Sequence, residues 1–300
     1  MKSTYLNRVT LRQIQVFLTV SRLSSYSKAA EELALTQPAV SAQVRQLEDV
    51  VGAPVFDYLG KQLYLTPVGE AVQRAGRDFL QRLIGLEMEL AELRGLMQGT
   101  LTIAIESSAQ YFMPTELAEF CKAHPAVDVA LEVVNHQVAL QRLSENLDDL
   151  VVMGQVPSER ALTFIPFRDN ELIAVSAARH ELAAQRQIPL LRLADEMLLI
   201  REAGSGTRKA FDAFCQQQSV IFSRRQQLGS LEAIKQGVRG DLGIAVLPRE
   251  ACARELRDGD LVVLDVRDMP LRRSWCAVYP RGKNLTPVAE AFLQHLTQES

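Results

Sequence analysis

Apolar positions along this 300-residue chain follow three different patterns, and each pattern predicts a different kind of structure. Within residues 1–66 they recur every three or four positions in short runs, which predicts small helices. Over residues 67–98 one continuous heptad repeat predicts a single long helix. Over residues 99–300 short apolar runs alternate with helical periods, as in α/β domains. We therefore expect three units with these boundaries.

Three short helices are predicted in the first unit. Each begins after a residue that caps helix N-termini well: Thr10, Ser25 and Thr36. Pro38 lies in the first turn of the third helix, where its missing N–H group costs nothing. The expected inward faces consist of apolar or small residues at helical spacing: Leu11, Ile14, Phe17, Leu18, Ser21, Ala29, Ala30, Leu33, Val40, Val44 and Leu47. Gly52 ends the third helix, and Val55-Phe56 and Leu63-Tyr64-Leu65 then predict a two-stranded wing.

The outward side of the third helix predicts contacts with DNA. In a helix-turn-helix the N-terminal residues of the second helix of the motif reach base edges, and nearby polar residues hold phosphates. The expected groove-facing set is Gln37, Pro38, Ser41 and Ala42. The expected backbone-contacting set is Ser27, Lys28, Arg45 and, at the tip of the wing, Lys61. On spacing alone, the same residues also fit the solvated surface of an ordinary three-helix cluster.

Charge adds modest support for this interpretation. Residues 1–66 carry seven Lys/Arg and five Asp/Glu, which leaves a local net charge of +2, whereas the whole chain has a net charge of −3. The chain is therefore not a bulk polycation, and any positive surface that attracts nucleic acid must be local.

The long helix predicts pairing between two copies of the chain. Thr66-Pro67 marks its start, with a cap followed by proline in the first turn. Spacings of 4, 3, 4, 3 and 4 separate its seam residues: Phe79, Leu83, Leu86, Leu90, Leu93 and Met97. Such a seam fits a homodimer that places two recognition helices on an inverted repeat. The alternative is that the seam packs against the body of its own chain.

The third unit predicts a largely parallel sheet with helices on both faces. Ligands of such sheets bind at the carboxyl ends of strands, beside helix N-termini. Two stretches fit this position, 106–111 (Glu-Ser-Ser-Ala-Gln-Tyr) and 201–208 (Arg-Glu-Ala-Gly-Ser-Gly-Thr-Arg). Their glycine N–H groups, hydroxyls and arginines suit a carboxylate or phosphate. The alternative is that each stretch is only a turn followed by a helix cap.

Composition and motifs argue against several other classes of function. Neither a dinucleotide fingerprint nor a nucleophile elbow, paired carboxylate or histidine-based nucleophile is recognisable, so we expect neither catalysis nor a cofactor. The four cysteines and four histidines lack metal-ligand spacing, which predicts buried thiols and no metal. We find neither an apolar run of membrane-spanning length nor a signal peptide, and therefore expect a cytoplasmic protein without membrane contact.

Residues 11–69 resemble the N-terminal winged helix-turn-helix of LysR-type transcriptional regulators. The resemblance rests on many residues at fixed spacing: Phe17, Ala29-Ala30, Gln37-Pro38-Ala39-Val40-Ser41, Leu47-Glu48, Gly52, Phe56, Leu65-Thr66-Pro67 and Gly69. It implies an α+β multidomain protein with a winged helix-turn-helix, a long dimerisation linker helix and a two-lobed, periplasmic-binding-protein-like α/β effector domain. Ala42 and Tyr58 depart from the pattern, because many members carry a basic residue at these positions.

The resemblance continues through the α/β region and is specific to the regulators of RuBisCO and Calvin-cycle operons. The runs that carry it include Val134-Asn135-His136, Gly154-Gln155, 201–208 and 279–283. It implies one lobe at 99–161 and 267–300, a second lobe at 162–266, and an effector such as a phosphorylated sugar or NADPH. The effector cleft is then expected to be lined by Ser107, Ser108, Gln110, Asn135, Gly154, Arg201, Ser205, Thr207 and Arg208.

Together these observations predict a regulator of transcription that binds double-stranded promoter DNA and a small anionic metabolite. The resemblance implies a homodimer or homotetramer and adds RNA polymerase as a candidate partner. The missing charge at Ala42 and Tyr58 motivates one alternative, a metabolite-binding protein without promoter control. An α/β enzyme fused to a DNA-binding domain is the other.

Overall fold

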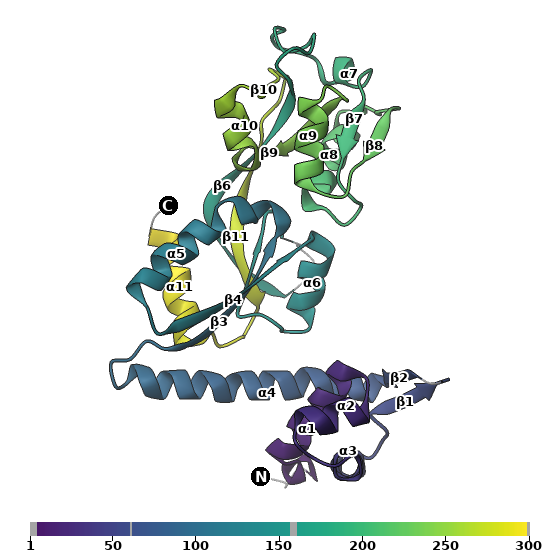
Figure 1. The fold of residues 1–300 in the computed structure, drawn as a ribbon, viewed down its shortest axis with the longest axis vertical. Coiled ribbons are helices and arrows are strands. Elements are labelled where there is room, and N and C mark those ends of the chain that lie inside the picture. Colours follow the sequence, from purple (N-terminus) through teal and green to yellow (C-terminus); the bar gives the residue numbers. More distant parts are fainter. Residues whose placement is uncertain (1–4, 61, 157–160, 299–300) are drawn as a thin grey trace. The chain divides into compact units, whose positions relative to one another are not determined.

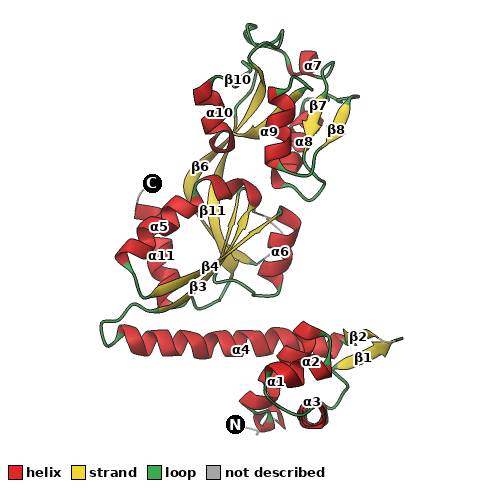
Figure 2. Ribbon diagram, in the orientation of Figure 1, coloured by secondary structure: helices red, strands yellow, loops and turns green. Residues whose placement is uncertain are grey.

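The structure of the protein is a computed structural model that describes residues 5–60, 62–156 and 161–298 (Figure 1). The chain divides into two compact units, Met1–Glu87 and Met88–Ser300. The boundary between them lies within one long helix. The first unit is mainly helical and the second is an α/β domain (Figure 2), so the change of apolar pattern near residue 99 marks a change of architecture.

The first unit contains the three predicted helices and the wing. Its elements are η1 (Tyr5–Arg8), α1 (Leu11–Leu23), α2 (Tyr26–Glu32), α3 (Gln37–Val51), β1 (Phe56–Leu59), β2 (Gln62–Leu65) and most of α4 (Pro67–Glu92). The predicted caps are confirmed, because Thr10, Ser25 and Thr36 each accept a hydrogen bond from a first-turn N–H group. Gly52 ends α3 with a φ of 81°, a left-handed conformation that glycine adopts without strain. Strands β1 and β2 are antiparallel.

Part of the predicted inward face of α1 is wrong. The side chains buried on this helix are Gln13, Val16, Phe17 and Val20, whereas Leu11 is 41% exposed. Ile14 and Leu18 face α4, since a Cβ atom added to Gly76 of α4 would lie 3.0 Å from Cγ2 of Ile14 and 3.5 Å from Cδ1 of Leu18. The helix has two packed sides, one toward the core of the helix-turn-helix and one toward α4. The predicted face took Phe17 from the first side and Ile14 and Leu18 from the second, and it missed Val16 and Val20.

The apolar seam of α4 is exposed over much of its length. Phe79, Leu86 and Leu90 are 47%, 44% and 48% exposed. Exposed apolar residues in heptad register form the kind of surface that a partner helix covers in a coiled coil. Met88 and Ala91 lie off the seam and are buried, so α4 also packs against the body of the second unit through other residues.

The seam ends earlier than its heptad spacing predicts. Helix α4 stops at Glu92, and Gly95 follows with a φ of 76°, a left-handed residue of the kind that ends helices. Leu93 and Met97 therefore lie beyond the helix. Met97 packs instead against a core of the second unit, so its apolar character reflects that core and not the seam.

Within the described residues, one nine-stranded sheet forms the frame of the second unit. Its strands are β3 (Gly99–Glu106), β4 (Val127–Val134), β5 (Leu150–Met153), β6 (Leu162–Ala177), β7 (Leu198–Ile200), β8 (Arg225–Gln227), β9 (Ile244–Pro248), β10 (Leu261–Val263) and β11 (Leu271–Pro280). The order is β4-β3-β5-β11-β6-β9-β7-β8, with β10 beside β6. The prediction of a largely parallel sheet is only half right. Two parallel groups, β4-β3-β5 and β9-β7-β8, are joined through antiparallel β11 and β6.

Long strands β6 and β11 connect two lobes, each with its own helices (Figure 1). The first lobe contains β3, β4 and β5 with α5 (Met113–Ala123), α6 (His136–Ser144) and α11 (Pro287–Gln298). The second contains β7 to β10 with α7 (Leu190–Leu193), α8 (Gly206–Gln217), α9 (Leu231–Arg239) and α10 (Ala253–Asp258). Two short turns, η2 (Ser107–Tyr111) and η3 (Glu250–Cys252), follow β3 and β9. In each lobe, helices cover both faces of the sheet.

The change of lobe lies inside β6 and β11. Phe167 packs in the core of the first lobe and Leu172 in the core of the second, so the crossing falls a few residues beyond the predicted boundary at 162. On the return strand, Leu271 still packs against the second core and Trp275 belongs to the first. The two middle portions of these strands thus form the floor between the lobes.

The cysteine thiols lie mainly in the apolar interior. All four cysteines are free, and Cys215, Cys252 and Cys276 are buried while Cys121 is half-buried. No helix among the described residues combines the length and the apolar character that crossing a membrane would require.

Candidate functional site

The first candidate site is the exposed tip of α3. Gln37, Pro38, Ala42 and Arg45 are exposed, and Ser41 is half-buried. The Nε2 atom of Gln37 donates to Oγ of Ser41 at 3.1 Å, so the two polar groups are held side by side one helical turn apart. Amides and hydroxyls at the start of a recognition helix have the chemistry to contact base edges. All of the predicted groove-facing residues therefore lie on one accessible tip.

Three of the four predicted backbone-contacting residues are exposed on α2 and α3. Ser27 and Lys28 are exposed in the first turn of α2, just after its cap Ser25. Arg45 is exposed on α3. Lys61 lies outside the described residues, so its assignment stays a prediction. Among the described residues, neither Lys28 nor Arg45 forms a close ion pair, so their positive charges are not neutralised.

Buried contacts under α2 and α3 set the position of the wing. The ring of Tyr26 packs edge-on against Phe56 of β1, with centroids 6.0 Å apart. Burial raises the pKa of Tyr26 to about 12, and the charge of Glu48 adds to the rise, so the phenol stays neutral. Oε1 of Glu48 accepts the N–H of Val55 at 2.9 Å. These contacts fix the turn from α3 into the wing, where Tyr58 is 62% exposed.

The second candidate site lies between the two lobes of the second unit. Stretches 106–111 and 201–208 meet there, because Nη2 of Arg201 donates to Oγ of Ser107 at 3.1 Å. Asn135 joins them, since its Nδ2 atom lies 3.1 Å from the position of a Cβ on Gly204. The Oδ1 atom of Asn135 accepts the N–H of Val138 at 2.9 Å and so caps α6. Segments that are separate in sequence thus meet between the lobes, at the place that we call the cleft.

The N-terminus of α8 supplies an anion-binding corner of this cleft. Ser205 caps the helix, and both Ser205 and Thr207 are 4% exposed. Arg201 is 6% exposed and pairs with Glu202 through two hydrogen bonds, of 2.8 and 2.9 Å. Its remaining terminal nitrogen, Nη1, is buried without a partner in the described part of the chain. A helix N-terminus beside a buried guanidinium favours a bound carboxylate or phosphate.

Four further predicted lining residues lie in different surroundings. Arg208 donates to the carbonyl of Arg201 at 3.0 Å and to Oε1 of Gln227 at 3.1 Å, so its guanidinium braces α8 against β8. Gln110 is exposed, whereas Ser108 is buried. Gly154 is buried at the end of β5. Arg201 is therefore better placed than Arg208 to meet an anion, and the contacts of all these residues with a ligand stay predictions.

Sequence reasoning did not include a buried acid–histidine pair in the cleft. Oε1 of Glu106 lies 2.7 Å from Nδ1 of His136, and the two residues are 5% and 4% exposed. Oε2 of Glu106 accepts the N–H of Gly154 at 3.2 Å and lies 3.1 Å from the position of a Cβ on Gly206, the first residue of α8. A carboxylate from the first lobe thus already faces the anion-binding corner of the second. Its position directly after a buried strand was the available signal.

Sequence reasoning also missed two polar residues on the connecting strands. Asn170 of β6 and Arg273 of β11 are direct cross-strand partners. Asn170 is 2% exposed, and neither its amide nitrogen nor its amide oxygen has a partner in the described chain. Nη1 of Arg273 donates to the carbonyl of Gly206 at 3.4 Å, while its Nε is buried and unpartnered. A buried polar group left unpaired costs about 1–3 kcal/mol, so these atoms have unused capacity for hydrogen bonds.

Burial also acts on the charge of Arg273. It lowers the pKa of the guanidinium, and the nearby Glu106 carboxylate acts in the opposite direction by favouring the charged form. A guanidinium remains charged in proteins at neutral pH, so Arg273 brings a desolvated positive charge to the floor between the lobes.

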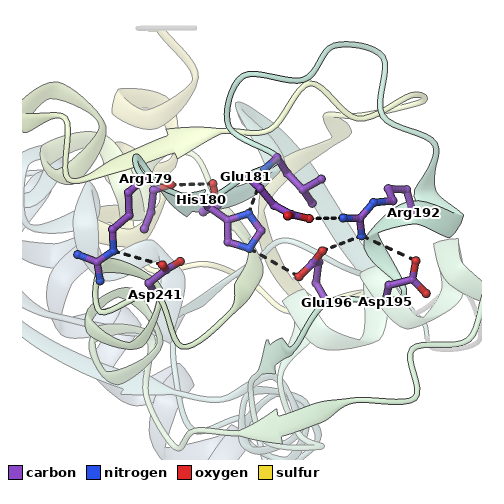
Figure 3. Close-up of polar contacts among 10 residues, drawn as sticks. Arg179, His180, Glu181, Arg192, Asp195, Glu196 and Asp241 are labelled. Atoms are coloured by element: carbon purple, nitrogen blue, oxygen red, sulfur yellow. Dashed lines mark hydrogen bonds and ion pairs between the residues drawn. The ribbon is translucent and has the colours of Figure 1, made fainter.

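Another polar cluster, in the second lobe, consists of charges that satisfy one another (Figure 3). Arg192 is its centre and contacts the carboxylates of Glu181, Asp195 and Glu196. Nε2 of His180 lies 3.7 Å from Glu196, and Arg179 pairs with Asp241 at 3.2 Å. Because its ion pairs are partly exposed, each adds little to stability. This network ties the segment after β6 to α7 and leaves no unpaired charge for a ligand.

Comparisons with known proteins cover both units of the chain. Residues 11–70 match the family described as bacterial regulatory helix-turn-helix protein, lysR family. Residues 94–300 match the family described as LysR substrate binding domain. The RuBisCO operon transcriptional regulator of Acidithiobacillus ferrooxidans is 45% identical over 291 residues, covering 97% of this chain and 94% of that protein.

Solved structures extend the comparison to the fold. The CcmR regulatory domain of Synechocystis, solved in complex with 2-PG, is 36% identical with a TM-score of 0.65, and the match covers 67% of this chain and 97% of that one. Full-length OxyR from Pseudomonas aeruginosa has a TM-score of 0.78 at 20% identity over 96% of this chain and 94% of that one. At that identity the second likeness concerns the fold alone.

Proposed function

The chain belongs to the LysR family of bacterial helix-turn-helix regulators, and from this premise we propose that it controls transcription by binding promoter DNA in response to a small phosphorylated anion. The observation that carries the proposal is the combination, in one chain, of an accessible recognition-helix tip and a buried anion-binding corner. Access to promoter DNA places the protein in the cytoplasm. It acts by binding alone, without a reaction of its own.

Promoter binding is supported by the chemistry of the α3 tip. Gln37 and Ser41 offer an amide and a hydroxyl to base edges, and Lys28 and Arg45 offer charge to phosphates. The exposed seam of α4 supports a homodimer. Two paired copies would present two recognition helices to an inverted repeat.

Effector binding is supported by the α8 corner and by one relative. The Synechocystis regulatory domain was solved with 2-PG, 2-phosphoglycolate, a small phosphate ester. Ser205, Thr207 and the free Nη1 of Arg201 supply hydroxyls and charge of the kind that holds phosphate. Contacts from both lobes meet there, so a ligand would favour one lobe arrangement. A ligand shifts the regulator only if it binds two arrangements with different affinity.

One experiment tests the DNA-binding part. Footprinting of the intergenic DNA beside the gene should reveal a protected site, with salt-sensitive affinity as expected when phosphates are neutralised. Ser41→Ala should reduce the ratio of specific to random-DNA affinity by about fivefold or more, since base contacts carry about 1–3 kcal/mol of discrimination. Arg45→Ala should instead weaken both affinities together. Equal loss on specific and random DNA in Ser41→Ala would contradict the groove assignment.

A second experiment tests the effector part. Thermal-shift titration with 2-phosphoglycolate should stabilise the wild-type chain by mass action. Arg201→Ala should abolish the shift, whereas Arg208→Ala should reduce it mildly because its guanidinium braces α8. Exposed Arg254 has no role in the cleft, so Arg254→Ala serves as the matched control. A full shift in Arg201→Ala would remove this residue from the site.

A second candidate function is favoured by two DNA-facing positions that carry no charge. Ala42 is exposed on α3 and Tyr58 on the wing, where many relatives carry a basic residue. A metabolite-binding protein without promoter control would retain the thermal shift and lack any protected DNA site. The two experiments above therefore separate the candidates.

A further inference from the structure

The floor between the lobes carries a pair of residues to which the proposed function assigns nothing. Asn170 and Arg273 face each other on β6 and β11, the strands that connect the lobes. We propose that this pair binds a carboxylate on the effector, so that the protein selects a short phosphorylated carboxylic acid over phosphate esters that lack a carboxylate. This inference rests on the proposed phosphate-binding corner at α8.

The unpaired atoms point to a ligand group that accepts hydrogen bonds. Asn170 is 2% exposed, with both amide atoms unpartnered in the described chain, and Nε of Arg273 is likewise unpartnered. An amide presents a donor and an acceptor whichever way it is turned. Together the pair offers two donors, from Asn170 and Arg273, and one positive charge. A carboxylate satisfies both donors and balances the charge, while Oδ1 of Asn170 stays available to a hydroxyl.

Neighbouring residues keep this amide at the floor. A Cβ on Gly154 would lie 2.5 Å from Nδ2 of Asn170 and 3.4 Å from Nη2 of Arg273. Any larger residue at Gly154 would therefore displace the amide. Strand order β3-β5-β11-β6 puts Arg273 on the strand between Asn170 and the acidic residue Glu106. The guanidinium thus separates a ligand carboxylate from the carboxylate of Glu106, which His136 holds.

The spacing of the two anchors limits the length of the ligand. Nη1 of Arg273 lies 3.4 Å from the carbonyl oxygen of Gly206, the first residue of α8. The carboxylate anchor is therefore adjacent to the helix N-terminus that forms the phosphate corner. Because the anchors are adjacent, we expect a molecule with its phosphate and carboxylate separated by one or two carbons to reach both, whereas a nucleotide has no carboxylate for the second anchor.

The test compares two ligands that differ only in the carboxylate. Isothermal titration of the full chain is carried out with 2-phosphoglycolate and with ethyl phosphate, in which a methyl group replaces the carboxylate. Wild-type protein should bind 2-phosphoglycolate about tenfold or more tightly than ethyl phosphate, because hydrogen bonds to a charged group contribute about 1.5–3 kcal/mol and each 1.4 kcal/mol is tenfold.

Asn170→Leu, close to asparagine in shape, removes the amide. It should lower the affinity for 2-phosphoglycolate about tenfold and leave that for ethyl phosphate unchanged. The melting temperature of the ligand-free variant should stay equal or rise, since an unpaired buried amide is lost. Asp169→Asn, exposed on the opposite face of the same strand, is the control. Asn170→Asp, which removes a donor and adds a negative charge, should also lose 2-phosphoglycolate selectively.

Each other outcome counts against the inference in a distinguishable way. If wild-type protein binds 2-phosphoglycolate and both Asn170 variants bind it equally well, the pair has no part in recognition while the proposed function stands. Equal loss of both ligands would make Asn170 a structural residue. A wild-type protein that binds the two ligands equally would contradict carboxylate recognition without any variant. Failure of wild-type protein to bind either ligand would overturn the phosphate corner and this inference together.

Discussion

The two candidate sites are built in opposite ways. The DNA-facing tip comes from residues 27–45, consecutive turns of α2 and α3 whose side chains are placed by helix geometry alone. The effector cleft takes residues from well-separated segments between Glu106 and Arg273, which only the folded sheet brings together. A site of the first kind can be identified from spacing. A site of the second kind exists only once strand order and register are known.

The sites also differ in how they treat charge. Lys28 and Arg45 are exposed to water, where a charge acts through long-range, salt-sensitive attraction. In the cleft, buried Arg201 pairs with half-buried Glu202, and Glu106 pairs with His136 away from water, where electrostatic interactions are stronger. Changes in the cleft should therefore alter ligand affinity and the stability of the second unit while leaving ligand-free DNA affinity intact.

The largest effect is expected from breaking the pairing of two copies. Leu86→Glu puts a charge into the exposed seam of α4, and burying an unpaired charge costs several kcal/mol. Affinity for an inverted-repeat site should fall about 100-fold or more, with a shift from dimer to monomer by sedimentation velocity. Ligand affinity should not change. Exposed Glu87→Ala is the neighbouring control, and an unchanged sedimentation coefficient in Leu86→Glu would rule out this seam as the dimer contact.

A strong and more local effect is expected at Gly154. The added Cβ in Gly154→Ala would lie 2.5 Å from Nδ2 of Asn170, and overpacking of this kind costs about 1–3 kcal/mol. Chemical denaturation should show the loss in the second unit, together with weaker ligand binding and unchanged ligand-free DNA affinity. Gly229→Ala, where an added Cβ meets nothing within 4 Å, should be close to neutral. Similar behaviour of the two variants would mean that the floor is looser than its contacts indicate.

A smaller effect in the opposite direction is expected at Glu106. Its carboxylate faces the start of α8, so it repels an anion bound at that corner. Glu106→Gln should raise phosphate-ester affinity about fivefold to tenfold, from removal of about 1 kcal/mol of repulsion at the effective dielectric of a protein. Titration calorimetry measures the change. A loss of affinity would show instead that the Glu106 carboxylate accepts a hydrogen bond from the ligand.

The smallest effect concerns alkaline pH and again separates the two units. Burial raises the thiol pKa of Cys215 to about 11 and of Cys252 to about 12, from 9.0. The folded state keeps these protons longer than the unfolded state, so the stabilisation is complete below pH 9 and is lost as the pH rises above it. At pH 9 each thiol accounts for a loss of about 0.4 kcal/mol.

Unfolding of the second unit, followed from pH 7 to 10, should show this decline. Replacing both thiols by alanine should reduce it, leaving a contribution from Cys276, whose thiol pKa burial also raises. The first unit has no cysteine, so its own transition serves as the internal reference. A decline of equal slope in the double variant would assign the effect to other groups.

Local signals in the sequence predicted the first unit except for part of α1. The caps Thr10, Ser25 and Thr36, the stop at Gly52 and the stripe of Val40, Val44 and Leu47 are as predicted. These features depend on hydrogen bonds and periodicity within a few residues. Helix α1 differs because two neighbours bury two sides of it, and one period describes only one side.

Sequence patterns report local interactions only, and this also explains which features of the second unit could be predicted. Its strands and helices, the family resemblance and the two polar stretches at 106–111 and 201–208 were recognisable. The antiparallel pair β6 and β11 was not, because a return crossing between lobes leaves no mark in local periodicity. Asn170 and Arg273 were missed for that reason, since a polar residue in a strand gains meaning only from its cross-strand partner.

The sequence by itself determined the nature of the protein: three capped helices with a polar tip, a heptad seam, and an α/β region with anion-suited turns. Each of these is encoded by residues that interact within one or two turns or one strand. Only the tertiary structure decided that α4 stops at Glu92, that Arg208 braces α8 while Arg201 keeps an unpartnered nitrogen, and that Asn170 and Arg273 meet on the floor between the lobes. Those features depend on sheet order, register and burial, which arise from contacts between segments distant in the chain.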